Sequence, residues 1–291
     1  MLMFFVVIGS YSLNVFLHSL GYFLLCKTYK WSQVTTQQLI LFNLSVAEGL
    51  FSLLALVEEL LDYFLPLDVT WSWAYFRSIF VMLHFVIYFT MLFMTLDRLS
   101  AVALSFKYQL YWRVGRTKKV LATIWFVGFM LGVCTCVILI MRSIDIQIII
   151  VLFTAFRYCQ FVSSTVFVVT ALSTYAVIFW KYRKSRNELR SSGSSNENGQ
   201  QNSRLRFRIP ALIIFTFVLF DSFPLCIWVI SYSSFTSWSL LDVSRILYAL
   251  GYMADALIYI FLQREVRKQL FSCCNKQVTT EPSSISIVAI I

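Results

Sequence analysis

Seven long runs of apolar residues set the kind of structure that this chain can form. A helix needs about 20 apolar residues to cross the ~30 Å hydrocarbon core of a bilayer, and each run is long enough. Only 13% of the residues are charged and 59% are hydrophobic, whereas soluble proteins hold roughly twice that share of charge. We therefore predict an all-α membrane protein with a seven-transmembrane helix bundle. The expected spans are roughly Met1–Cys26, Gln38–Leu61, Trp73–Leu104, Val120–Met141, Ile146–Trp180, Ile209–Tyr232 and Leu241–Leu262.

The basic residues give this bundle a direction. Cytoplasmic loops of membrane proteins are enriched in Lys and Arg. With the N-terminus outside, the inner side receives all of the 24 basic residues except Arg77, Arg142, Arg157 and Arg245. The net charge of +10 then reflects topology and a surface facing anionic lipid, so nucleic-acid binding is not needed to explain it. We expect a multi-pass protein of the plasma membrane, with an extracellular N-terminus and a cytoplasmic C-terminus.

One inner connection differs from the short polar connections elsewhere. From about 184 to 206 the sequence is basic at both ends and rich in Ser, Asn and Gly between them, which is typical of a flexible loop without its own core. We predict one membrane domain over residues 1–271, interrupted by this third inner loop, followed by a cytoplasmic tail over 272–291.

Two carboxylates lie deep within predicted spans. Glu48 is in the middle of the second span, and Asp255 is in the second half of the seventh. A charged side chain at the centre of a span costs roughly 2.5–3.5 kcal/mol on insertion scales, so each needs a partner. Either each forms its own protonated contact between helices, or the two share a polar cluster that holds a proton or a cation. We favour the shared cluster.

Short motifs on successive spans resemble those of rhodopsin-like (class A) G-protein-coupled receptors. The third span ends in Asp97-Arg98-Leu99, which is similar to the family's Asp-Arg-Tyr motif. Trp125 follows at the family's spacing for the fourth-helix tryptophan. The remaining marks are the Asn43–Glu48 pattern, Tyr175, Pro224, the Asp255–Tyr259 segment in place of Asn-Pro-x-x-Tyr, a short amphipathic eighth helix at Gln263–Phe271, and Cys273 and Cys274 at a palmitoylation position.

This resemblance implies a receptor that transmits an extracellular ligand signal to a heterotrimeric G-protein by outward movement of the sixth helix. Asp97 would hold Arg98 at rest, and Tyr175 and Tyr259 would hold the active state. Pro224 is expected to kink the sixth helix, because proline lacks an N–H and its ring clashes with the preceding turn. Ser and Thr residues of the tail suit an arrestin-type regulator. Neither a cofactor nor a metal is expected.

The chain also departs from the family pattern. Trp73 stands where many members carry a disulfide cysteine, and the second outer loop has no cysteine. Ser222 and Ala256 replace the sixth-helix tryptophan and the seventh-helix proline. The short outer loop, the missing disulfide and Asp255 are together similar to the melanocortin, adenosine and cannabinoid receptor group. The missing tryptophan leaves open how ligand binding reaches the sixth helix.

An outer ligand pocket is expected among the second, third and seventh spans. Glu58 and Glu59 either receive a basic group of a peptide or form a solvated acidic rim. Phe80 stands where aminergic receptors carry an aspartate, which argues against a monoamine; the ligand is otherwise a peptide or a small molecule. The predicted lining is Glu58, Glu59, Arg77, Phe80, His84 and Asp242.

Two other classes compete with this interpretation. A transporter or channel needs ionisable groups along one path, or broken helices in matching halves. The sequence has a single prolyl kink within its spans. An enzyme is not expected, because His18 and His84 are the only histidines and stand on separate spans without a zinc or nucleophile motif.

Overall fold

In the part of the chain that it describes, the computed structural model contains five long α-helices. It describes residues 2–28, 34–64, 70–104, 108, 113–140, 158, 162, 165–180, 183, 212–213, 215–216, 218–222, 238–261 and 266–267. The long helices are α1 (Leu2–Thr28), α2 (Thr36–Phe64), α3 (Thr70–Leu104), α5 (Val114–Ile140) and α9 (Trp238–Phe261). A shorter apolar helix spans Thr165–Trp180, and a π-helical turn, η4, spans Val218–Ser222. These described parts are helical and contain no strand, in agreement with the all-α prediction.

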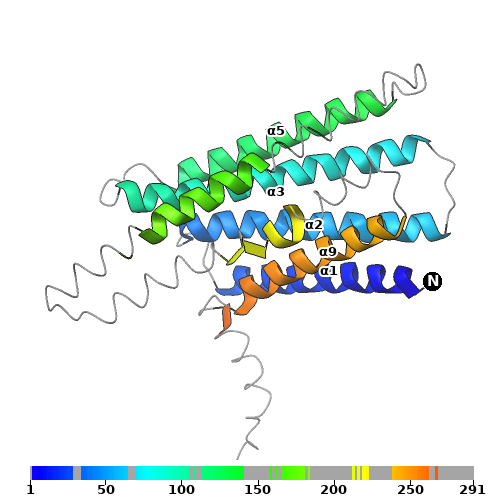
Figure 1. The fold of residues 1–291 in the computed structure, drawn as a ribbon, viewed down its shortest axis with the longest axis horizontal. Coiled ribbons are helices and arrows are strands. Elements are labelled where there is room, and N and C mark those ends of the chain that lie inside the picture. Colours follow the sequence, from blue (N-terminus) through cyan, green and yellow to red (C-terminus); the bar gives the residue numbers. More distant parts are fainter. Residues whose placement is uncertain are drawn as a thin grey trace, which may run out of the picture.

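The helix α2 lies at the centre of the bundle. It contacts α1, α3, α5 and α9, while α3 also packs on α5 and α1 on α9. The long helices run side by side along the longest axis (Figure 1). The start of α1, the end of α2 and the starts of α3 and α9 share one end of the bundle, called here the N-terminal end. The end of α3 and the start of α2 lie at the opposite end (Figure 1).

Four helices in the described ranges are long and apolar enough to cross a membrane. They cover Phe4–Thr28, Thr36–Leu61, Tyr75–Ala101 and Val114–Ile140, which correspond to the first four predicted spans. The fourth begins at Val114 and not at Val120. The sequence prediction excluded the basic residues before Val120, but charged side chains are tolerated at a helix end, where they reach water.

The remaining predicted spans are described in part. The fifth is represented by Thr165–Trp180, and the sixth by short segments that include η4. The seventh corresponds to α9, which begins at Trp238, earlier than predicted, and carries Asp242, Arg245 and Asp255. Of the predicted eighth helix, only Val266 and Arg267 are described, and Val266 packs in a buried cluster with Leu24 and Ile260. The third inner loop and the tail lie outside the described residues.

The distribution of polarity is inverted relative to a soluble protein. Phe16 and Phe126 are 61% exposed and Phe179 is 66% exposed on the outside of the bundle, whereas Glu48 is fully buried inside it. Exposed aromatic rings in such numbers would promote aggregation in water, but they match the hydrocarbon of a bilayer. The helices therefore suit a membrane-embedded protein.

Two glycines allow α5 to approach α3 closely. A Cβ atom added to Gly128 would lie 2.7 Å from Cγ2 of Val86, and one added to Gly132 would lie 3.1 Å from the backbone oxygen of Ser78. Small residues spaced four apart let two membrane helices pack backbone to backbone. The position of α3 is thereby fixed by packing along its middle.

Candidate functional site

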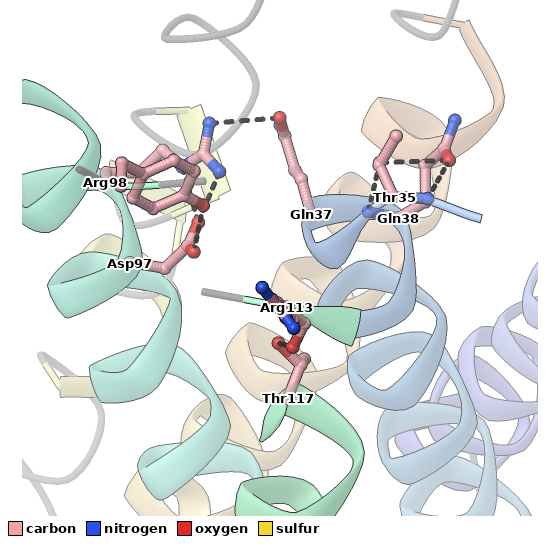
Figure 2. Close-up of polar contacts among 8 residues, drawn as sticks. Thr35, Gln37, Gln38, Asp97, Arg98, Arg113 and Thr117 are labelled. Atoms are coloured by element: carbon pink, nitrogen blue, oxygen red, sulfur yellow. Dashed lines mark hydrogen bonds and ion pairs between the residues drawn. The ribbon is translucent and has the colours of Figure 1, made fainter. Parts of the chain in front are cut away.

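A buried ion pair lies near the end of α3. Asp97 is 0% exposed and Arg98 is 6% exposed. Arg98 Nε donates to Oδ2 of Asp97 at 3.0 Å, and Nη2 donates to the same oxygen. Nη1 donates to Oε1 of Gln37, in the first turn of α2, at 3.1 Å (Figure 2). A buried charge is costly unless partners replace its water, and here those partners come from α3 itself and from α2.

Tyr108 provides the hydrogen-bond partner of the second carboxylate oxygen of Asp97. Its hydroxyl donates a hydrogen bond to Oδ1 of Asp97. Burial, followed by the hydrogen bond to Asp97, raises the pKa of Tyr108 well above its usual value. The phenol therefore stays protonated at neutral pH and remains a donor. Both oxygens of Asp97 are thus occupied, one by Tyr108 and the other by Arg98.

The predicted switch residue Tyr175 lies near this pair. Its hydroxyl is buried and has no hydrogen-bond partner among the described residues. It lies within electrostatic range of both Arg98 and Asp97. An unpaired buried hydroxyl costs free energy, so Tyr175 is a donor and acceptor that a displaced Arg98 could use.

A second polar group lies inside the bundle, where α2 meets α9. Glu48 and Asp255, which are 0% and 1% exposed, lie close enough for their carboxyl groups to interact. The Tyr259 hydroxyl donates to Oε2 of Glu48 at 3.1 Å. The structure therefore brings together the two carboxylates of the predicted cluster and adds Tyr259 to them. Two buried carboxylates at this distance would repel each other if both were ionised, so a shared proton or a bound cation would stabilise the pair.

Two members of this cluster were missed by the sequence reasoning. His18, on α1, places Nε2 3.9 Å from Oε2 of Glu48 and 3.2 Å from the carbonyl oxygen of Tyr252. Its Nδ1 lies 3.2 Å from the hydroxyl oxygen of Ser45. Thr216 donates a hydrogen bond to Oδ1 of Asp255. The available signal for His18 was its mid-span position, because a buried imidazole at membrane depth needs polar partners just as a carboxylate does.

His18 is held by partners that fit either protonation state. Carbonyl oxygens only accept, so Nε2 carries a proton in the bond to Tyr252. The Ser45 hydroxyl can donate to a neutral Nδ1 or accept from a protonated one. The contact geometry therefore survives gain of a proton. A Cβ added to Gly49 would lie 3.2 Å from Cβ of His18, so the glycine leaves room for the imidazole.

The tryptophan predicted by resemblance joins three helices. Trp125 Nε1, on α5, donates to Oδ1 of Asn43 at 2.7 Å, and Nδ2 of Asn43 donates to Oγ1 of Thr90 at 3.0 Å. Asn43 lies on α2 and Thr90 on α3. These hydrogen bonds link α3 and α5 to α2 at Asn43, which lies more than one helical turn before Glu48 on α2.

Two ion pairs lie at the N-terminal end of the bundle. Arg77 Nη2, on α3, is 3.2 Å from Oε1 of Glu58, and Arg245 Nη1, on α9, is 2.8 Å from Oε1 of Glu59. Arg245 was assigned to the outer face but not to the predicted pocket. Glu58 and Glu59 are therefore each paired with an arginine of the chain itself. This arrangement differs from the predicted acidic rim open to a basic ligand.

The aromatic members of the predicted pocket surround one phenylalanine. Phe51, on α2, makes edge contacts with Phe80 at 5.0 Å and with His84 at 5.1 Å between ring centroids. Tyr248, on α9, contacts His84 at 5.9 Å. The guanidinium of Arg77 lies 6.0 Å from the Phe80 ring centroid. Four of the six predicted lining residues, Glu58, Arg77, Phe80 and His84, thus lie where α2 faces α3, whereas Glu59 pairs with α9.

Other predicted site residues lie beyond what is described. Asp242 belongs to α9, but its side chain is not described; Pro224, Cys273 and Cys274 lie outside the described residues. The π-helical turn η4 ends at Ser222, just before Pro224. Such turns are a known cause of helix bending, so the irregularity begins where the proline kink was expected.

The described residues contain no group of three or more His, Cys, Asp or Glu arranged to hold a metal ion. No protein-family model matches the chain, and no curated protein matches it. The function of the chain is therefore inferred from the arrangement of its own residues.

Proposed function

We propose that the chain is a rhodopsin-like G-protein-coupled receptor with seven transmembrane helices and an eighth amphipathic helix. The observation that carries this proposal is the Arg98 site, where a buried arginine pairs with its own neighbour at the end of a long helix. Burying an arginine costs free energy even when it is paired, so a buried arginine suggests a role in another conformational state. The basic residues of the predicted inner loops favour a cytoplasmic position for this end of the bundle, where a heterotrimeric G-protein would meet it.

In this proposal the resting state keeps Arg98 folded against Asp97. An agonist at the N-terminal end binds the active conformation better and shifts the population toward it. The sixth helix then moves outward, and Arg98 leaves Asp97 to contact the G-protein. The hydroxyl of Tyr175, which lacks a partner among the described residues, is suited to receive Arg98 in that state.

The cluster of Glu48, Asp255 and Tyr259 would couple α2 to α9 and the sixth helix during this change. A proton shared by the two carboxyl groups could be exchanged for a cation, and His18 provides a third titratable group at 3.9 Å from Glu48. Activity of the receptor would then depend on sodium or pH. A basal activity that ignores both would remove support for this role.

The alternative is a transporter or channel. The observation in its favour is the same buried cluster, since ionisable groups deep in a membrane often mark ion or proton paths. However, its described members contact one another across α1, α2 and α9, and the described segments show no corresponding pair of broken helices. We therefore place it second.

The test is nucleotide exchange on a Gα subunit in membranes from cells that express the chain, with a ligand panel. Wild type should give basal or stimulated exchange, and Arg98→Ala should abolish it at equal surface expression. Arg113→Ala is the matched control, because Arg113 is an exposed arginine at the same end of the bundle and should keep the exchange. Substrate flux or current in the same cells, without exchange, would instead support the transporter or channel.

A further inference from the structure

The start of α2 is fixed by a reciprocal cap. The backbone N–H of Thr35 donates to Oε1 of Gln38 at 2.8 Å, and the N–H of Gln38 lies 3.3 Å from Oγ1 of Thr35. The carbonyl of Thr35 accepts the first helical bond, from Leu39, at 3.0 Å. This is a capping box, in which two side chains satisfy the free donors of the first turn. It sets where the helix begins, and Thr36 and Gln37 lie between its two members.

Gln37 is the second of these residues, and it points at Arg98. Its Oε1 accepts from Nη1 of Arg98 at 3.1 Å, while Gln38 turns back to Thr35 (Figure 2). Nε and Nη2 of Arg98 are taken by Asp97, on the same helix. Among the described residues, Gln37 is therefore the hydrogen-bond partner that ties the guanidinium to another helix.

The predicted sixth span has no acidic residue near its cytoplasmic end that could pair with Arg98. Between Glu197 and Asp221 the sequence contains no carboxylate, and Arg204, Arg206 and Arg208 precede the span. Like charges repel, so this segment cannot hold Arg98 by an ion pair at the cytoplasmic end. A restraint on Arg98 has to come from elsewhere, and α2 supplies one.

We propose that Gln37 is a positioning residue that holds Arg98 in the resting state, so that the first turn of α2 sets the basal activity. This inference rests on the proposed receptor function. Release of Nη1 from Gln37 lowers the barrier to the outward swing of Arg98, while the pair with Asp97 can persist until the sixth helix moves. The amide is neutral, so the hold is directional and weaker than a second ion pair.

The first measurement compares basal nucleotide exchange in three variants at equal surface expression. Gln37→Leu removes the acceptor and should raise basal exchange roughly three- to tenfold, the range expected when one typical net hydrogen bond is lost from one of two states. Gln37→Glu puts a carboxylate in the same place and should return the exchange to the wild-type value or below. Gln38→Leu is the matched control, because it removes the cap without touching Arg98, and should leave basal exchange near wild type.

These results separate positioning from a merely structural role. If Gln38→Leu raises basal exchange as much as Gln37→Leu does, or if Gln37→Glu fails to rescue, the stability of the first turn is responsible and the inference is overturned. Rescue by glutamate together with a silent Gln38 variant supports it.

A second measurement does not depend on signalling. Thermal unfolding of the full chain in detergent, for Gln37→Leu, Arg98→Leu and the double variant, gives the coupling between the two side chains. A double variant less destabilised than the sum of the singles supports the contact, even if no G-protein responds and the proposed function fails. Additive effects overturn the inference and leave the receptor proposal standing.

Discussion

The two ends of the bundle hold their charges in opposite ways. At the N-terminal end each ion pair joins two helices: Glu58 and Arg77 link α2 to α3, and Glu59 and Arg245 link α2 to α9. At the opposite end Asp97 and Arg98 are neighbours on one helix, so their ion pair links no helices. The links to other parts of the chain are hydrogen bonds with uncharged side chains: Gln37 accepts from Arg98, and Tyr108 donates to Asp97.

We call the two outer ion pairs, Glu58–Arg77 and Glu59–Arg245, the clamp, and the Asp97–Arg98 pair the latch. An ion pair between helices resists their separation, whereas an ion pair within one helix leaves the arginine free to swing once weaker restraints are released. The outer ion pairs are also more exposed than the Asp97–Arg98 pair. Side chains of the outer pairs are 31% and 12%, and 39% and 13%, exposed, against 7% and 1% for Arg98 and Asp97. Solvent therefore screens the clamp more than the latch.

Breaking the latch should give the largest effect. Asp97→Asn removes the charge that faces Arg98 and leaves a buried guanidinium without its counter-ion, which typically costs about 3–5 kcal/mol. We expect lower thermal stability and a basal nucleotide exchange raised roughly tenfold or more. Adding Arg98→Ala should abolish the rise, because the released arginine produces it. A rise that survives the second substitution would show that Asp97 acts by another route.

The middle of the bundle should respond less strongly. In Gly128→Ala, the new Cβ would meet Val86 at 2.7 Å and the backbone oxygen of Met82 at 3.2 Å. Overpacking of this kind costs about 1–3 kcal/mol, which exceeds the gain in helix propensity from alanine. Thermal unfolding should show the loss.

Gly9→Ala is the control for this variant, since nothing lies within 4 Å of the Cβ that it adds. It should be neutral or slightly stabilising. If Gly128→Ala costs no more than Gly9→Ala, then the Arg77–Glu58 pair, and not close packing with α5, holds α3 in place.

The sequence could predict those contacts that a buried charge needs to offset the free energy lost when it leaves water. A carboxylate at membrane depth must find a partner, so the meeting of Glu48 with Asp255 could be predicted from their depths alone. The Asp97–Arg98 pair was also accessible, because neighbours at a helix end share the same surroundings. The roles assigned to these residues stay predictions.

Contacts that depend on helix rotation could not be anticipated. Gln37 is one of several polar residues at a span boundary, and only its hydrogen bond with Arg98 shows that it faces α3, while Gln38 turns back to Thr35. The partners of His18 include the backbone carbonyl of Tyr252, which carries no residue-type signal. Arg245 is far from Glu59 in the sequence, and their contact requires α9 to lie beside α2.

Reversing one outer pair should give the smallest effect and test the screening argument. Glu59→Arg places two cations together and should lower stability by about 0.5–1 kcal/mol, as partly exposed pairs do; adding Arg245→Glu should restore most of the loss. In about 1 M salt the Debye length falls to about 3 Å, so the difference between the single variant and wild type should shrink. The loss caused by Asp97→Asn should persist, because water and ions do not reach that pair. A clamp variant that ignores salt while the latch variant responds to it would reverse the comparison between the two ends.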